Sequence, residues 1–130
     1  MTVYTYGVFD LLHYGHLRAL KKAKAMGDKL IIGVFTDEVA TLFKRKPVMT
    51  EVERLNAIKE LEWGEVRLLK TLIPDGEELE GVDIVTKAAG AGWSEDSVPE
   101  LENGEAVLLP YTKGVSTSEI IKRIYDRNIK

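Results

Sequence analysis

The sequence contains no cysteine among its 130 residues, which excludes disulfides, thiolate metal sites and a cysteine nucleophile. It has no apolar run as long as a membrane span, and its start lacks the layout of a signal peptide. The formal net charge is only −3, which argues against a broad surface for nucleic acid. We therefore expect a cytoplasmic protein that neither binds nucleic acid nor inserts into a membrane.

What the chain does contain is typical of an ordinary globular protein, with 45% hydrophobic and 30% charged residues. Its length is enough to bury a core without cross-links. We find no internal repeat, low-complexity tract or linker. These features predict a single domain over residues 1–130.

Stretches typical of strands alternate with stretches typical of helices. Apolar residues recur at helical spacing at Leu17, Leu20, Ala23 and Met26, and again at Val52, Leu55, Ile58 and Leu61. Capping boxes are predicted for the pairs Thr50/Glu53 and Ser116/Glu119. The expected strands cover residues 1–9, 28–38, 65–73, 82–88 and 104–111, and the expected helices cover residues 16–27, 36–43, 50–64 and 116–128.

This alternation predicts an α/β fold, a Rossmann-like open parallel sheet of about five strands with helices on both faces. Ligands bind such sheets at the carboxyl ends of the strands. Both histidines of the chain, His13 and His16, follow the first expected strand. They stand three residues apart at the start of a helix, so they can reach a common ligand.

The histidine segment leaves three interpretations open. Gly15 lets an anion approach the backbone, and a helix N-terminus attracts negative charge, so the segment favours a phosphate site. The histidines could instead be packing or surface residues. A zinc pair is the third interpretation, but no cysteine or further histidine is present to complete the coordination.

Two other segments carry weaker signals for phosphate. The sequence "FKRKP", residues 43–47, is a solvated basic turn or a loop that reaches over a triphosphate bound beside the first strand. The sequence "TKGVSTSEI", residues 112–120, is an ordinary capped helix start or a second helix N-terminus that holds phosphate oxygens.

Taken in order, these segments resemble the cytidylyltransferase branch of the HxGH nucleotidyltransferases. The resemblance covers nearly the whole chain. It rests on the sequences "YGVFDLLHYGHLRALKKAKAMGD" (6–28), "LIIGVFTDE" (30–38), "FKRKPVMTEVER" (43–54) and "TKGVSTSEIIKRI" (112–124).

The resemblance implies roles for individual residues. His13 and His16 would contact the nucleotide phosphates and stabilise the charge that develops on the α-phosphate. Lys44 would bridge the acceptor and nucleotide phosphates, and Arg54 would support the same charged pocket. The other nucleotide-binding residues it implies are Gly7, Val8, Phe9, Asp10, Gly15, Thr112, Gly114, Val115, Ser116 and Thr117.

The implied reaction is transfer of CMP from CTP to a small phosphorylated alcohol (glycerol 3-phosphate, choline phosphate or ethanolamine phosphate) or to a phosphonate. An acceptor oxygen attacks the α-phosphorus in line and pyrophosphate leaves. Mg²⁺ would accompany the triphosphate, and no metal site is expected from protein side chains alone. The resemblance also implies a homodimer.

The chain departs from the family pattern at three places. Tyr111 stands where the family has an arginine, and a second arginine has no counterpart near Glu62. The loop "TKAAGAGWSED", residues 86–96, keeps a tryptophan, Trp93, without the aspartates before it. Tyr111 and Trp93 either pack or shape the acceptor pocket, where two aromatic rings could cage a quaternary ammonium.

Lost arginines remove bidentate phosphate donors. The candidate replacements in the sequence are Arg45, Lys70, Lys87 and Lys113. Two alternatives to a cytidylyltransferase therefore stay open: a related enzyme that uses ATP or an unusual acceptor, and a non-catalytic nucleotide-binding relative.

Overall fold

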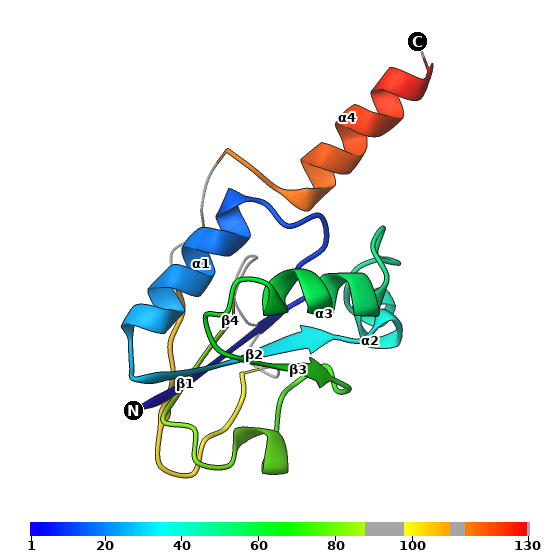
Figure 1. Ribbon diagram of the computed structural model, residues 1–130. Helices are drawn as coiled ribbons and strands as arrows, with labels where there is room; N and C mark the ends of the chain where they lie inside the picture. Colours follow the sequence, from blue (N-terminus) through cyan, green and yellow to red (C-terminus); the bar gives the residue numbers. More distant parts are fainter. Residues whose placement is uncertain (88–97, 110–113, 130) are drawn as a thin grey trace.

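The computed structural model describes residues 1–87, 98–109 and 114–129 (Figure 1). Five parallel strands form one sheet in the order β3-β2-β1-β4-β5. The α/β fold with an open parallel sheet is thereby confirmed. The strands are β1 (Thr2–Gly7), β2 (Lys29–Phe35), β3 (Glu65–Leu69), β4 (Ile84–Lys87) and β5 (Glu105–Ala106).

Helices connect the strands and cover both faces of the sheet. They are α1 (Tyr14–Ala25), α2 (Asp37–Phe43), α3 (Glu51–Lys59) and α4 (Thr117–Ile129), with a short 3-10 helix η1 (Gly76–Leu79). Helices α1 and α3 lie over one face, where they contribute Leu20 and Ile58 to a buried apolar cluster (Figure 1). Helix α2 and η1 contribute Val39 and Leu79 to a second cluster.

Most expected elements are present, and the differences are local. Helix α1 begins at Tyr14, two residues before the expected start, because His13 caps it. Of the strand expected over 104–111, β5 covers Glu105–Ala106. Val52 shares the helical spacing of Leu55 and Leu61 but not their burial: Val52 is 59% exposed, while Leu55 and Leu61 pack against the core.

The strand order reverses between β1 and β4. From β1 the chain moves outward through β2 to β3, whereas β4 and β5 lie on the other side of β1. A crevice forms at the carboxyl ends of strands where the order reverses in this way. Both the loop that carries His13 and the end of β4 reach this edge.

Helix α4 extends away from the sheet (Figure 1). Its first turn stays attached, because the Thr117 hydroxyl donates a hydrogen bond of 2.9 Å to the carbonyl of Asp10. Farther along, Ile124 and Tyr125 are exposed. No helix in the described part of the chain is long and apolar enough to cross a membrane.

Candidate active site

The turn between β1 and α1 is held in an uncommon backbone conformation. Phe9 and Leu11 have positive φ angles of 56° and 50°. Side chains other than glycine rarely adopt this region, and such residues persist only where the surroundings enforce them. Burial of the Phe9 ring in the core beside α1 supplies that constraint.

His13 and His16 cap the first turn of α1 reciprocally. Nδ1 of His13 accepts a hydrogen bond from the Gly15 backbone N–H at 3.1 Å, and Nδ1 of His16 accepts one from the His13 backbone N–H at 3.2 Å. The two rings stack with centroids 3.8 Å apart. Because Nδ1 is an acceptor in both, each neutral ring carries its proton on Nε2 and has one N–H donor left.

Gly15 is required by this close packing. A Cβ atom at residue 15 would lie 2.9 Å from Cε1 of His13 and 3.1 Å from Cγ1 of Val115. Because residue 15 is a glycine, the His13 ring and Val115, which precedes α4, can both pack against its backbone. The access for an anion expected at Gly15 from the sequence stays a prediction.

Burial keeps both imidazoles uncharged. It lowers the pKa of His16 from 6.5 to about 3, with a further contribution from the neighbouring His13, and it also lowers the pKa of His13. In the absence of ligand the pair is neutral at pH 7. The histidines are then hydrogen-bond donors through Nε2–H, and the positive charge of the site comes from other residues.

The depressed pKa makes stability depend on pH. Between pH 6.5 and about 3 the unfolded chain binds a proton at His16 that the folded chain does not. The free energy of unfolding is therefore unaffected by His16 above pH 6.5 and decreases as pH falls below that value. We expect unfolding in urea to show a loss of about 2 kcal/mol from His16 between pH 7.5 and pH 5.0. In a His16→Gln variant, which keeps a capping acceptor, the loss should be smaller by that amount; an equal loss in both proteins would contradict the assignment.

Asp10 joins three segments of the site. Its carboxylate accepts hydrogen bonds from the backbone N–H groups of Val48 at 2.8 Å and Met49 at 2.9 Å, one on each oxygen. Its carbonyl accepts the Thr117 hydroxyl. Asp10 therefore holds the loop after β1, the segment before α3 and the start of α4 together.

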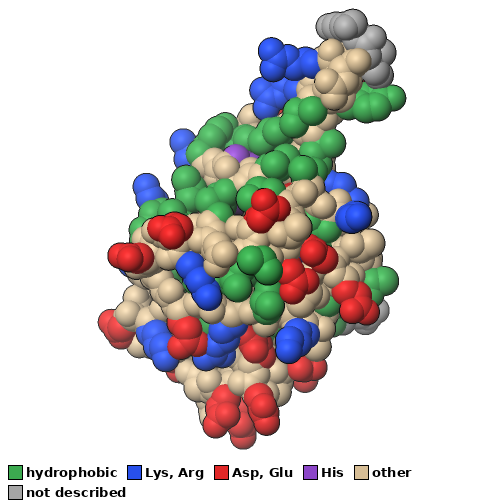
Figure 2. All heavy atoms as spheres, turned by 45° about the vertical axis from the view of Figure 1, so that its right-hand side comes forward, with side chains coloured by type: hydrophobic (Ala, Val, Ile, Leu, Met, Phe, Trp, Pro, Cys, Tyr) green, Lys and Arg blue, Asp and Glu red, His purple; other side chains and the backbone are tan. Residues whose placement is uncertain are grey.

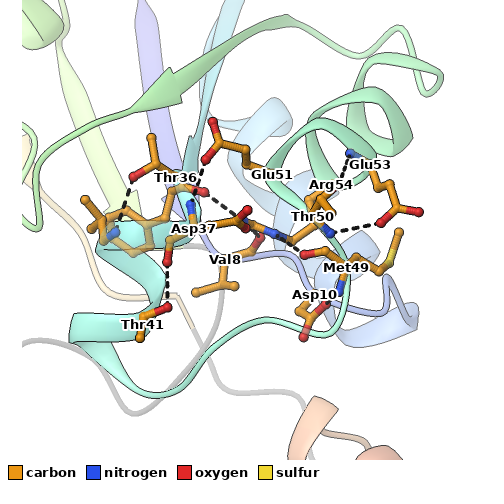
Figure 3. Close-up of polar contacts among 12 residues, drawn as sticks. Val8, Asp10, Thr36, Asp37, Thr41, Met49, Thr50, Glu51, Glu53 and Arg54 are labelled. Atoms are coloured by element: carbon orange, nitrogen blue, oxygen red, sulfur yellow. Dashed lines mark hydrogen bonds and ion pairs between the residues drawn. The ribbon is translucent and has the colours of Figure 1, made fainter.

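Arg54, like Asp10, forms hydrogen bonds to several segments of the chain (Figure 3). The side chain is fully buried, and it donates hydrogen bonds to the carbonyls of Val8, Phe35 and Met49 and to the carboxylate of Asp37. The ion pair with Arg54 lowers the pKa of Asp37. Arg54, expected to support the charged nucleotide pocket, is fully buried, joins the strand ends and is not among the described residues that line the cavity; its role toward the nucleotide stays a prediction.

A cavity lies at this edge of the sheet, among the described residues. It is lined by the end of β1 and the following turn, by the two histidines, by the end of α2 with the basic segment, and by the start of α4. Histidine atoms are visible between hydrophobic side chains at the base of the projecting helix (Figure 2). The residues expected from the sequence that line it are Gly7, Val8, Phe9, Asp10, His13, His16, Lys44, Val115, Ser116 and Thr117.

The other expected residues are not among the described lining residues, and Gly15 and Arg54 are two of them. Gly114 is next to the lining, with a positive φ of 94° that favours glycine at the turn into α4. Trp93, Tyr111 and Thr112 lie outside the described residues.

The structure also separates the candidate cations. Arg45 and Lys87 line the cavity, Lys70 is exposed outside it, and Lys113 lies outside the described residues. Phe43 is a lining residue that the sequence analysis missed. The available signal was its position as the last residue of a short helix that leads into the basic segment.

Comparison with known proteins shows which family the chain is similar to. A family model described as cytidylyltransferase-like matches residues 4–73. A glycerol-3-phosphate cytidylyltransferase of Staphylococcus aureus is 31% identical, covering 98% of both chains. A second such protein, from Bacillus spizizenii, is 36% identical over 92% of this chain and 94% of its own length.

Two further relatives extend the comparison. An ethanolamine-phosphate cytidylyltransferase of Dictyostelium discoideum is 34% identical over 94% of this chain, which spans only 36% of that protein. Among solved structures, a lipopolysaccharide core biosynthesis protein from Thermoplasma volcanium is 26% identical, with a TM-score of 0.57 and coverage of 98% of this chain and 88% of that one.

Proposed function

The chain belongs to the cytidylyltransferase-like family, and we propose that it transfers CMP from CTP to a small phosphorylated alcohol or a phosphonate, with release of pyrophosphate. One observation carries the proposal: two stacked histidines and Lys44 line a single cavity at the point where the strand order reverses. The near full-length similarity to two glycerol-3-phosphate cytidylyltransferases supports the choice of reaction.

In the proposed reaction, an oxygen of the acceptor phosphate forms a bond to the α-phosphorus while the bond to the bridging oxygen of pyrophosphate breaks. The Nε2–H groups of His13 and His16 would donate to the α-phosphate as its charge redistributes, beside the positive end of the α1 dipole. Lys44 would hold the two reacting phosphates against each other. Val115, Ser116 and Thr117 would face the nucleotide from the start of α4.

No general base is required from the protein. An acceptor phosphate is already ionised at neutral pH, so its oxygen needs no proton removed before attack. Both carboxylate oxygens of Asp10 already accept backbone hydrogen bonds, and both histidine Nδ1 atoms are similarly engaged. The site therefore suits catalysis by positioning and electrostatic stabilisation.

Mg²⁺ fits this scheme as part of the substrate. Within the described ranges, no group of three or more acidic or histidine side chains could hold a metal, and the carboxylate in the cavity, Asp10, is occupied by backbone donors. We propose that the ion enters on the phosphate oxygens of CTP. The homodimer and the cytoplasmic location stay predictions.

The proposal is tested by measuring pyrophosphate release with Mg²⁺, with each of the four common ribonucleoside triphosphates crossed against glycerol 3-phosphate, choline phosphate, ethanolamine phosphate and phosphonates. We expect release with CTP and one class of acceptor, and none when the acceptor is omitted. Turnover with ATP instead would support the alternative nucleotide. Binding of CTP by calorimetry without any release would support a non-catalytic relative.

A further inference from the structure

The cavity has a second cationic wall that the proposed reaction does not yet use. Lys87 is the last residue of β4 and lies beside Tyr6 of β1 in the sheet register. It lines the cavity together with Lys44 and Arg45. Its side chain is half-buried, and burial lowers the pKa of its ammonium group. A half-buried ammonium group in a cavity is suited to bind an anionic ligand, because the anion compensates its charge where water is partly excluded.

Lys87 also covers the face of the Phe43 ring, an aromatic face that a cationic ligand could otherwise contact. Its Nζ lies 4.4 Å from the centroid of the Phe43 ring, in a cation–π contact. Of the other rings that line the cavity, Phe9 packs edge-on against His16, and Phe35 packs between Tyr6 and Phe43. In the described part of the lining, a substrate ammonium would meet an ammonium already in place over the Phe43 ring.

Among the described residues, the same lining offers an ammonium group one carboxylate, and that carboxylate is already engaged. Asp10 is the acidic residue among its described members, and backbone N–H groups from Val48 and Met49 occupy both of its oxygens. In the described lining, an acceptor with a cationic end would therefore lose water and meet only a carboxylate that already accepts two backbone hydrogen bonds.

The position of Lys87 associates it with the acceptor. The histidines start α1, and His16 packs on Phe9 in the cluster covered by α1 and α3. Lys87 lies over Phe43 at the end of α2, the helix that covers the opposite face. Two anionic substrates that meet in one cavity require positive charge on both sides of the reacting phosphorus.

We infer that Lys87 makes the acceptor site selective for a phosphorylated alcohol whose other end is neutral or anionic, such as glycerol 3-phosphate, and selects against phosphorylated amino alcohols such as choline phosphate and ethanolamine phosphate. This inference rests on the proposed function for its reaction. Its recognition element, the Lys87 ammonium over Phe43, is a property of the cavity itself.

The test compares kcat/KM for glycerol 3-phosphate and choline phosphate in the natural protein and in Lys87→Met, Lys87→Glu and Lys70→Met. Lys70 follows β3, is exposed and lies outside the cavity, so Lys70→Met is a matched control. We expect Lys87→Met to raise the KM for glycerol 3-phosphate by about 10- to 100-fold with the KM for CTP unchanged, the loss typical of one charged hydrogen bond. Lys87→Glu should shift the preference toward choline phosphate.

Two kinetic results would overturn the inference. One is a natural protein that uses choline phosphate as well as glycerol 3-phosphate. The other is a Lys87→Met variant in which only the KM for CTP rises, because Lys87 would then serve the nucleotide.

Calorimetry with each acceptor, with and without CTP, separates this inference from the proposed function. If no turnover occurs but glycerol 3-phosphate binds, choline phosphate does not, and Lys87→Glu abolishes the difference, then the reaction is wrong and the selectivity stands. If turnover occurs and Lys87→Glu leaves the acceptor preference unchanged, the reaction stands and the selectivity is wrong.

Discussion

Replacing either histidine with a residue that keeps the helix cap is expected to reduce kcat by about 10²- to 10³-fold while the fold is retained. The suitable variants are His13→Asn and His16→Gln. Asparagine is a good N-cap, and glutamine at the third helical position can accept from the N-cap amide. Each variant therefore preserves the hydrogen bond now made by Nδ1 and replaces the imidazole, with its Nε2–H donor, by a carboxamide of different reach.

The measurement is kcat for pyrophosphate release, with urea unfolding at pH 7.5 as the control for the fold. The alanine variants of the same residues lose the cap as well, so they should be less stable than the cap-preserving variants by about 1 kcal/mol. Near-normal kcat in His13→Asn or His16→Gln would mean that the histidines serve the helix start alone, and the proposed role in charge stabilisation would be wrong.

Replacing Arg54 with methionine is expected to cost about 3–5 kcal/mol of unfolding free energy, a large part of the roughly 5–15 kcal/mol of a typical domain. The reason is that backbone carbonyls would be left without a hydrogen-bond donor. The carbonyls of Val8, Phe35 and Met49 would lose a partner, and each buried unpaired group costs about 1–3 kcal/mol. Val8 directly follows β1, and Phe35 is the last residue of β2. Because both residues line the cavity, activity should fall together with stability.

The control for this variant is Asp37→Asn. Asp37 is the fourth partner of Arg54, and its side chain is 43% exposed, so water can replace the lost contact. Removing its charge should cost about 1 kcal/mol or less. Urea unfolding at pH 7.5 compares the two variants. Equal losses would mean that the ion pair, and not the buried carbonyl bonds, accounts for the contribution of Arg54.

Local signals in the sequence predicted local structure well. The capping box of Thr50 and Glu53 is an example, because the N-cap and its partner lie within one turn. For the other predicted pair, the Glu119 N–H donates to the Ser116 hydroxyl at 3.1 Å, which is one half of a box. The parallel sheet followed from the alternation of strands and helices. The reciprocal cap of His13 and His16 was missed because histidine is an unusual capping residue, although the three-residue spacing of Thr50 and Glu53 was already present in that pair.

The sequence could not place residues whose environment is set by distant parts of the chain. Val52 has the spacing of a core position, but the helix presents it to solvent. Arg54 resembles a ligand-binding arginine in sequence, and its burial depends on strand ends up to 46 residues away. Lys87 could be placed in the cavity only once the register of β4 against β1 was known.

The hydrogen bond from the Thr117 hydroxyl to the Asp10 carbonyl has a consequence for the order of folding. It joins residues 107 positions apart, whereas the pairs that align β1 with β2 are separated by 27 positions, as in Thr2 and Lys29. Closing a longer loop costs more chain entropy, and distant contacts tend to form after nearer ones. A newly made chain is therefore expected to assemble its central strands first and to gain the wall carrying Ser116 and Thr117 last, so that the ability to bind nucleotide reports on the final stage of folding.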